Sequence, residues 1–376
     1  MNDLFSRALA LAQGQTASAS AILRVAQQTS DEAARWAFTQ WELRVRAGGK
    51  FSRASEMLFV REALEQATHE DLAAYHASRF PPGERVLDVT TGIGADLIAL
   101  AARGPAVGYE LDPERAECAR HNLGVAGLGA EVRVEDSLAV DWDADFVWAD
   151  PARRSQGRRT LSFDELSPDP RVLAARMRAL RRGGLKLSPM MRDADLESLG
   201  PQVEFVSFQG ECREALVWTG GEVSPEAARW AVHVRSGQRL LGEPRNAAGE
   251  SEPRAFIAEA DPAAIRAHAL PELSRQTGWL PLGESMGYLT RDEDLASPWV
   301  LHRFELVETV RFDPKVIQAR LRAHDEPLES IKHRGLELDH ARLQKVFGVR
   351  GVGSFVLLVY PGLSGVKAAL VRRIRS

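Results

Sequence analysis

The chain has 376 residues, of which 44% are hydrophobic and 27% are charged. This composition excludes disordered and fibrous classes, and the length predicts two or three domains. The two cysteines, Cys118 and Cys212, exclude a disulfide framework and lack metal-ligand spacing, so we expect no bound metal. The apolar run at residues 8–12 is too short for a signal peptide or a membrane span, so we expect a cytoplasmic protein without membrane contact.

The formal net charge of −4 hides an uneven distribution of charge along the chain. Residues 311–376 contain 13 lysines and arginines against 6 aspartates and glutamates, so the preceding part is strongly acidic. A basic C-terminal segment on an acidic body indicates a polyanionic partner, although a solvated charged surface would have the same composition.

Residues 1–80 show helical patterning, with apolar residues at helical spacing in 32–45 and 56–67. Pro81-Pro82-Gly83 then marks a domain boundary. We therefore predict an N-terminal helical domain that covers the ligand edge of the next domain. Its tail, residues 65–68, either reaches the ligand or simply ends a packed helix.

A Gly-rich turn follows the first predicted strand, in the run Arg85-Val-Leu-Asp-Val-Thr-Thr-Gly-Ile-Gly-Ala-Asp96. The strand ends at Asp88 and a helix begins at the end of the run, as in the nucleoside-binding turn of a doubly wound α/β sheet. Gly92 and Gly94 allow a tight turn and the close approach of a ligand. Leu97 stands where a dinucleotide fingerprint needs a third glycine, which disfavours a pyrophosphate-bound ligand.

Three further predicted strands of this domain also end in polar side chains. The second strand ends in Glu110, which is spaced to accept both hydroxyls of an adenosine ribose. The third is followed by Asp136 and Ser137, either of which is placed for the adenine amino group. The fourth ends just before Asp150. Together these positions predict a nucleoside site at the strand tips.

These strand ends, in this order, resemble those of class I S-adenosylmethionine-dependent methyltransferases over about residues 83–220. The resemblance implies a Rossmann-like seven-stranded α/β sheet, with its last two strands joined through Gly210, and S-adenosylmethionine as the cofactor. It implies that Asp88 and the Gly-rich turn hold the methionine end, that Glu110 binds the ribose, and that Asp136 with Ser137 binds the adenine. The alternative is a similar sheet that binds another nucleotide or none. The expected cofactor-binding residues are Asp88, Thr90, Thr91, Gly92, Ile93, Gly94, Asp96, Glu110, Leu111, Asp136 and Ser137.

Beyond this predicted methyltransferase domain, residues 81–222, the chain predicts three segments. Residues 223–252 are rich in Gly, Pro, Glu, Ser and Ala and predict a linker. Residues 253–298 predict a small ferredoxin-like α/β module, and residues 299–376 a β-α-β-α-β-β tail. The tail resembles the THUMP-type domains of tRNA-modifying enzymes, and the whole chain is similar to bacterial THUMP-like class I methyltransferases.

The residues after the fourth strand predict the acceptor site. Amino-methylating enzymes commonly carry Asn or Asp, two prolines and an aromatic residue there, which orient an exocyclic amino group and stack on the base. Asp150 and Pro151 match, whereas Ala152 and Arg153 replace the second proline and the aromatic. Because arginine can stack on a base or bind a phosphate, we predict catalytic roles for Asp150, Pro151 and Arg153. The alternative is that Asp150 and Pro151 only end the strand.

The Asp-Pro-x-Arg sequence at residues 150–153 also resembles that of 5-methyluridine methyltransferases, which need a cysteine nucleophile after the fifth strand. Ser188-Pro189 stand there, and Cys212 follows the sixth strand, so covalent pyrimidine methylation is disfavoured. We expect direct transfer to a nitrogen or oxygen, controlled by positioning and desolvation, with Asp150 orienting the acceptor.

Two groups of basic residues predict substrate contacts: the loop after Asp150, and the C-terminal tail around Lys332 and Arg334. The loop after Asp150 carries four arginines within seven residues, which repel one another unless an anion or acidic partner neutralises them. For each group the alternative is a solvated surface paired with local acids. The expected substrate-binding residues are Arg153, Arg154, Arg158, Arg159, Lys332 and Arg334.

We interpret the chain as an S-adenosylmethionine-dependent methyltransferase that modifies a nitrogen of RNA, in tRNA or rRNA. A second hypothesis is a methyltransferase that acts on a protein or on a small anionic metabolite. A third is a non-catalytic RNA-binding protein that keeps the cofactor fold.

Overall fold

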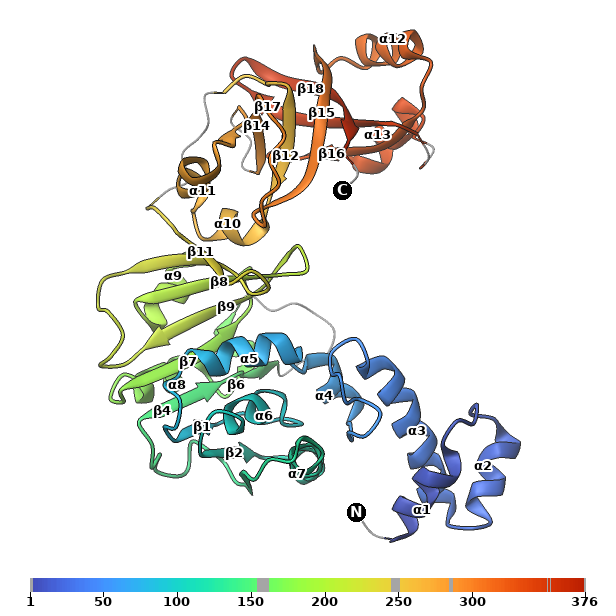
Figure 1. Cartoon of the computed structure of the whole chain (residues 1–376), viewed down its shortest axis with the longest axis vertical. Coiled ribbons are helices and arrows are strands. Elements are labelled where there is room, and N and C mark those ends of the chain that lie inside the picture. Colours follow the sequence, from blue (N-terminus) through green and yellow to red (C-terminus); the bar gives the residue numbers. More distant parts are fainter. Residues whose placement is uncertain are drawn as a thin grey trace. The chain divides into compact units, whose positions relative to one another are not determined.

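The structure is a computed structural model that describes residues 3–153, 162–244, 251–283, 287–349, 351 and 353–374. Helices and strands alternate along much of it, which confirms the mixed α/β fold predicted from the sequence (Figure 1). The chain divides into two compact units. The first is made of residues 1–187, 198–200 and 218–224, and the second of the remaining residues.

The first unit contains the N-terminal helices and a set of parallel strands. Its helices are α1 (Asp3–Ala12), α2 (Ala19–Ala26), α3 (Asp31–Ala47), α4 (Arg61–Gln66), α5 (Glu70–Ser78), α6 (Ala95–Ala101), α7 (Pro113–Ala126) and α8 (Pro170–Met177). Its strands are β1 (Val86–Asp88), β2 (Ala106–Glu110), β3 (Glu131–Val134), β4 (Phe146–Ala149), β5 (Ala152–Arg153), β6 (Leu166–Ser167) and β7 (Arg182–Leu187).

Helices α1 to α5 precede the Pro-Pro-Gly segment, in the part of the chain where the sequence predicts helices. Helix α3 begins after Ser30, whose side chain accepts a hydrogen bond from the N–H of Ala33 at 3.1 Å, the usual N-cap arrangement. Trp41 on α3 donates its indole N–H to the carbonyl of Leu9 on α1 at 2.9 Å. The hydrophobic cluster of these helices also includes Ile93, so the helices pack directly against the Gly-rich turn.

Strands β1, β2, β3, β4 and β7 pair in parallel, in the order β7-β4-β1-β2-β3. Every residue of β1 and β4 is buried, as in strands that are covered on both faces. Helices α6 and α7 pack beside β1, β2 and β3 as crossover connections (Figure 1). Because the carboxyl ends of parallel strands share one edge, Asp88, Glu110 and Asp150 come to the same edge of the sheet.

The second unit contains the elements that follow β7, apart from a few residues around α9 and β9. Its helices are α9 (Asp193–Leu199), α10 (Pro262–Arg266), α11 (Leu270–Thr277), α12 (Pro314–His324) and α13 (His340–Phe347). Its strands are β8 (Gln202–Phe208), β9 (Glu211–Thr219), β10 (Ala228–His233), β11 (Gln238–Leu241), β12 (Phe256–Ala260), β13 (Leu280–Pro281), β14 (Tyr288–Arg291), β15 (Val300–Arg311), β16 (Leu328–His333), β17 (Phe355–Gly362) and β18 (Gly365–Arg373).

Among the residues that the structure describes, the first sheet has nine strands, in the order β11-β10-β8-β9-β7-β4-β1-β2-β3, and not the seven expected. The additional strands, β10 and β11, lie within residues 223–252, which we expected to form a linker. β10 pairs with β8 in parallel and with β11 in antiparallel fashion. Buried Ala231, Val232 and Leu240 supply the apolar side chains of this hairpin. Ser236 and Gly237 lie in the turn between its two strands.

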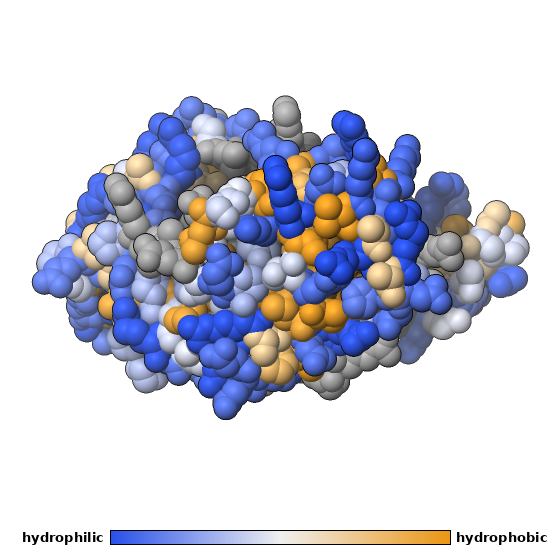
Figure 2. Space-filling model, turned by 90° about the horizontal axis from the view of Figure 1, so that it is seen from above, coloured by the Kyte–Doolittle hydropathy of each residue, from blue (hydrophilic) through white to orange (hydrophobic). Residues whose placement is uncertain are grey.

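The second sheet has the strand order β13-β14-β12-β15-β18-β17-β16. β12 belongs to the segment 253–298 and β15 to the segment 299–376, and the two strands pair in antiparallel fashion. The two expected modules therefore form one sheet. Separate hydrophobic clusters lie on β17 and β18, and the one that contains Ile317 of α12 and Phe347 of α13 is covered by these helices. Hydrophilic side chains cover most of the face drawn in Figure 2, with apolar areas between them.

Candidate active site

The Gly-rich turn after β1 is held by hydrogen bonds to Asp88. The N–H of Thr90 donates to Asp88 Oδ1 at 3.1 Å, and the hydroxyl of Thr91 donates to the Asp88 carbonyl at 3.1 Å. Gly92 and Gly94 adopt φ values of +56° and +91°, which L side chains rarely adopt. A Cβ at Gly92 would meet no atom within 4 Å, so the backbone of the turn is open to a ligand there.

Glu110, at the end of β2, is fixed by the backbone around it. One of its carboxylate oxygens accepts the N–H of Gly92 at 2.8 Å, and the other accepts the N–H of Asp112 at 2.9 Å. A carboxylate oxygen has a second lone pair, so each oxygen can accept one further hydrogen bond. The side chain is partly exposed and therefore suits two hydroxyl donors from a ribose.

Asp88 is buried, and its Oδ2 atom has no hydrogen-bond partner among the residues that the structure describes. Burial, followed by the neighbouring Asp96 carboxylate, raises the pKa of Asp88 well above its usual range, and the carboxylates of Asp150 and Glu110 act in the same direction. A buried acceptor without a partner is costly, and several carboxylates around it favour a cation. This environment fits the ammonium and sulfonium charges of S-adenosylmethionine.

Asp96, in the first turn of α6, is occupied by protein side chains. His76 on α5 donates its ring N–H to Asp96 Oδ1 at 2.7 Å, and the Thr68 hydroxyl donates to Asp96 Oδ2 at 2.9 Å. Burial favours a higher pKa for Asp96, but His76, Lys186 and Thr68 together lower the pKa below its usual value. The Asp96 carboxylate therefore connects the N-terminal helices to α6.

The residues expected around the adenine differ in their exposure. Asp136 is exposed, and its Oδ1 accepts the N–H of Leu138 at 2.9 Å. The hydroxyl of Ser137 is buried and donates to the carbonyl of Val89 at 3.0 Å. Leu111 is 64% exposed beside Glu110. Of these side chains, Asp136 is the polar one that solvent reaches.

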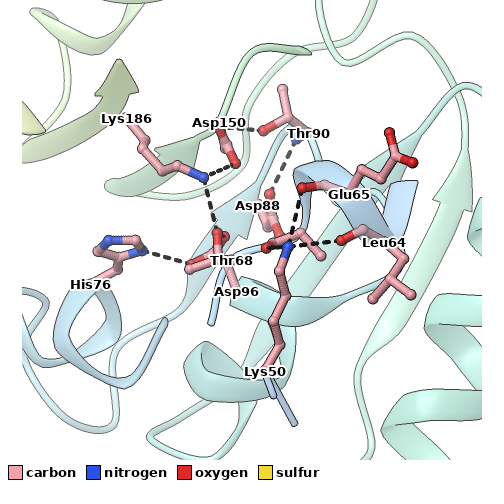
Figure 3. Close-up of polar contacts among 11 residues, drawn as sticks. Lys50, Leu64, Glu65, Thr68, His76, Asp88, Thr90, Asp96, Asp150 and Lys186 are labelled. Carbon is pink, nitrogen blue, oxygen red and sulfur yellow. Dashed lines mark hydrogen bonds and ion pairs between the residues drawn. The ribbon is translucent and has the colours of Figure 1, made fainter. Parts of the chain in front are cut away.

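Asp150 follows β4 and is held from two sides. Its N–H donates to the hydroxyl of Thr90 at 2.6 Å, and its Oδ2 lies 2.5 Å from the Nζ of Lys186 on β7. Lys186 also donates to the hydroxyl of Thr68 at 3.1 Å (Figure 3). Thr68 is therefore the residue of the predicted helical tail, residues 65–68, whose side chain bonds to Lys186 beside Asp150. The sequence interpretation missed Lys186, although a lysine between two buried leucines, Leu185 and Leu187, was a signal.

The remaining acceptor-site predictions lie on β5 and the loop after it. Pro151 is buried, and Arg153 is exposed on β5, where it pairs with Leu166 of β6. Arg154, Arg158 and Arg159 lie outside the described residues.

Lys332 and Arg334 of the second unit share one acidic partner. The Nζ of Lys332 lies 2.6 Å from Glu259 Oε2, and the guanidinium of Arg334 lies 3.6 Å from Glu259 Oε1. Glu259 is buried. Part of the positive charge of these two residues is therefore neutralised within the protein.

The thiols give no sign of a nucleophile. Burial raises the pKa of both Cys118 and Cys212 to about 12, so each thiol stays protonated at neutral pH. Within the described ranges, no group of three or more His, Cys, Asp or Glu side chains could hold a metal ion. Nor is any described helix long and apolar enough to span a membrane.

The comparisons with known proteins agree with this geometry. No protein-family model matches the chain. Uncharacterized S-adenosylmethionine-dependent methyltransferases of Mycobacterium tuberculosis, from strains CDC 1551 / Oshkosh and ATCC 25618 / H37Rv, are 32% identical over 328 residues, which cover 84% of this chain and 89% of each relative. The crystal structure of a candidate methyltransferase from Porphyromonas gingivalis W83 is 22% identical, with a TM-score of 0.82 over 99% of this chain and 98% of that one. That structure shares the fold over nearly the full length.

Proposed function

Since the chain belongs to the S-adenosylmethionine-dependent methyltransferases, we propose that it methylates a nitrogen of RNA, in tRNA or rRNA. When bound, S-adenosylmethionine supplies the methyl group from its sulfonium, and the acceptor nitrogen gains this group and loses one proton. The observation that carries the RNA proposal is a set of basic side chains in the second unit that have no acidic partner among the described residues.

The cofactor would lie along the strand tips of the first unit. The Oδ2 of Asp88 would accept a hydrogen bond from the methionine ammonium, beside the open backbone at Gly92. Glu110 would accept the ribose hydroxyls, and Asp136 the adenine amino group. Thr90, which bonds both Asp88 and Asp150, would connect this cofactor site to the acceptor site.

The basic residues of the second unit that have no acidic partner among the described residues lie on α12, α13 and the neighbouring strand ends. Arg311 of β15 and Lys367 of β18 stand directly opposite each other in an antiparallel pair, where like charges destabilise a sheet. A bound anion would relieve that repulsion. Within the part of the chain that the structure describes, no ion pair is formed by Arg311, Lys315, Arg322, Arg342, Lys345 or Lys367.

A phosphate backbone is the anion that would meet several such cations at once. Arg153, exposed beside Asp150, would contact RNA next to the reaction centre, and from the sequence we propose the same role for Arg154, Arg158 and Arg159. In this proposal residues 299–376 act as a THUMP-like RNA-binding domain. The pairing of Lys332 and Arg334 with Glu259 gives those two a smaller share of the binding.

The test is transfer of a tritiated methyl group from S-adenosylmethionine to total RNA of a strain that lacks the gene, followed by nucleoside analysis. We expect label in one N-methylated nucleoside. Label that stays absent from RNA but enters protein or an anionic metabolite would overturn the RNA proposal and support the second hypothesis. Cofactor binding without transfer to any acceptor would support the non-catalytic one.

A further inference from the structure

Lys186 occupies the acceptor site in a way that the cofactor does not explain. Its Nζ lies 2.5 Å from Asp150 Oδ2 and 3.1 Å from the hydroxyl of Thr68. The side chains of Lys186 and Asp150 are 17% and 27% exposed, so the ion pair is largely withdrawn from water. Coulomb attraction is much stronger there than at the surface. The Asp150 carboxylate is therefore held in one place by a positive charge.

The support of Lys186 continues into the N-terminal helices. The Thr68 hydroxyl accepts from Lys186 and donates to buried Asp96, which also binds the His76 ring (Figure 3). His76 is fully buried, and its ring stacks on Trp148 of β4, with ring centroids 4.4 Å apart. This row of contacts runs from Lys186 through Thr68, Asp96 and His76 to Trp148 of β4, so the Thr68 hydroxyl that binds Lys186 is itself held in place.

The segment that carries Thr68 is itself fixed at its backbone. Lys50 donates to the carbonyls of Leu64, Glu65 and Ala67 at 2.8, 3.1 and 2.8 Å (Figure 3). These carbonyls end helix α4, where a cation is favourable. The position of Thr68 thus follows from the fold of the N-terminal helices.

We propose that Lys186, held by Thr68, is a positioning and specificity residue of the acceptor site, which fixes the Asp150 carboxylate and restricts the acceptor to an uncharged nitrogen. A carboxylate paired with an ammonium accepts hydrogen bonds well but is a weak base. It can orient a neutral amino group, such as one on a nucleobase. It is poorly suited to remove a proton from an ammonium before transfer.

The same charge acts directly on the acceptor. An acceptor that arrives as an ammonium, as the amine of a protein lysine does at neutral pH, would meet the Lys186 ammonium beside Asp150. A neutral amino group meets no such repulsion. The proton that its nitrogen loses on gaining the methyl group passes to the Asp150 carboxylate and then to solvent. This inference rests on the proposed methylation of an RNA nitrogen.

Two variants of Lys186 separate its charge from its packing. Lys186→Met keeps the length of the side chain and removes the charge, whereas Lys186→Arg keeps the charge. We expect Lys186→Met to lower kcat for RNA methylation about 10- to 100-fold, because the acceptor is misplaced. Its loss should grow as the pH is lowered, because without the Lys186 ammonium the neighbouring Asp88 carboxylate favours a proton on Asp150. Lys186→Arg should recover part of the rate, and both should bind S-adenosylmethionine within a few-fold of wild type.

Melting temperatures test the ion pair without any acceptor, so that failure of this inference and failure of the RNA proposal are distinguishable. Lys186→Met and Asp150→Asn should each lower the melting temperature, because each leaves one charge partly buried without its partner. The double variant should lose less than the sum of the two. Arg46→Met, which removes only the exposed pair with Glu42 on α3, is the matched control and should change neither the rate nor cofactor binding.

Additive losses of melting temperature would overturn the pair. A Lys186→Met enzyme that methylates RNA at the wild-type rate over the whole pH range would overturn the positioning role. Wild-type transfer to protein lysines at a rate equal to or above that for RNA would overturn the specificity role.

Discussion

The charged residues of the two units differ in what neutralises them. At the strand tips of the first unit, Asp96 is bonded to His76 and Asp150 to Lys186, whereas the buried Oδ2 of Asp88 has no partner among the described residues. In the second unit Lys332 and Arg334 share Glu259, whereas Arg311, Lys315 and four further cations form no ion pair with a described residue. In each unit these unneutralised groups indicate the ligand better than the total charge does. The Asp88 carboxyl of the first unit points to a cationic ligand, and the unpaired cations of the second unit point to a polyanion.

The largest effect should come from Asp150→Ala. The acceptor then loses the carboxylate that orients it, so we expect RNA methylation to fall at least about 100-fold. Cofactor affinity, measured by calorimetry, should stay within a few-fold of wild type, because Asp88 and Glu110 are unchanged. Joint loss of folding and of cofactor binding would instead mean that Asp150 only terminates β4.

Glu110→Ala should weaken S-adenosylmethionine binding by about 1.5–3 kcal/mol, or roughly 10- to 150-fold in Kd, because two ribose hydroxyls lose a charged acceptor. The variant also frees the N–H groups of Gly92 and Asp112, which Glu110 holds now. Glu131→Ala, which removes an exposed partner of Arg133, is the control. Equal affinities of wild type and Glu110→Ala, measured by calorimetry, would contradict the ribose assignment.

Cofactor binding should depend on pH through Asp88. Its pKa is raised by burial and by the neighbouring acids, so the free protein takes up a proton there at a higher pH than an ordinary aspartate does, whereas a bound ammonium favours the carboxylate. Affinity should therefore fall as the pH drops through the raised pKa, and binding should release protons. Calorimetry in two buffers of different ionisation enthalpy measures this release. Asp88→Asn should bind weakly and without proton release, and a wild-type protein that releases none would contradict the assignment.

The basic residues of the second unit should differ in their effect on salt dependence. Replacing Arg311 and Lys367 with glutamine should reduce the slope of log K against log salt for RNA binding by about 0.7 to 0.9 for each phosphate that these side chains neutralise in the wild type. The same change at Lys332 and Arg334 should have a smaller effect, because Glu259 already neutralises part of their charge. Filter binding over a salt series gives both slopes. Equal changes in slope would remove the distinction between paired and unpaired cations.

The strand-tip acids could be predicted because each follows its own strand, and a parallel sheet brings such positions to one edge. The contacts of Lys186 with Thr68 and of Asp96 with His76 could not, because each joins segments far apart in the sequence. The β10–β11 hairpin was hidden by the polar residues of its connections. Charge counting found the basic tail, but it selected Lys332 and Arg334, whose shared acid lies 73 and 75 positions earlier in the chain.

The most direct test of the central claim follows a tritiated methyl group from S-adenosylmethionine into an extract of a strain that lacks the gene. The purified protein is added, and the RNA, protein and small-molecule fractions are counted separately, with Asp150→Ala protein as the matched control. We predict label in the RNA fraction, in an N-methylated nucleoside, and only background with the variant. Label confined to the protein or small-molecule fraction would contradict the account.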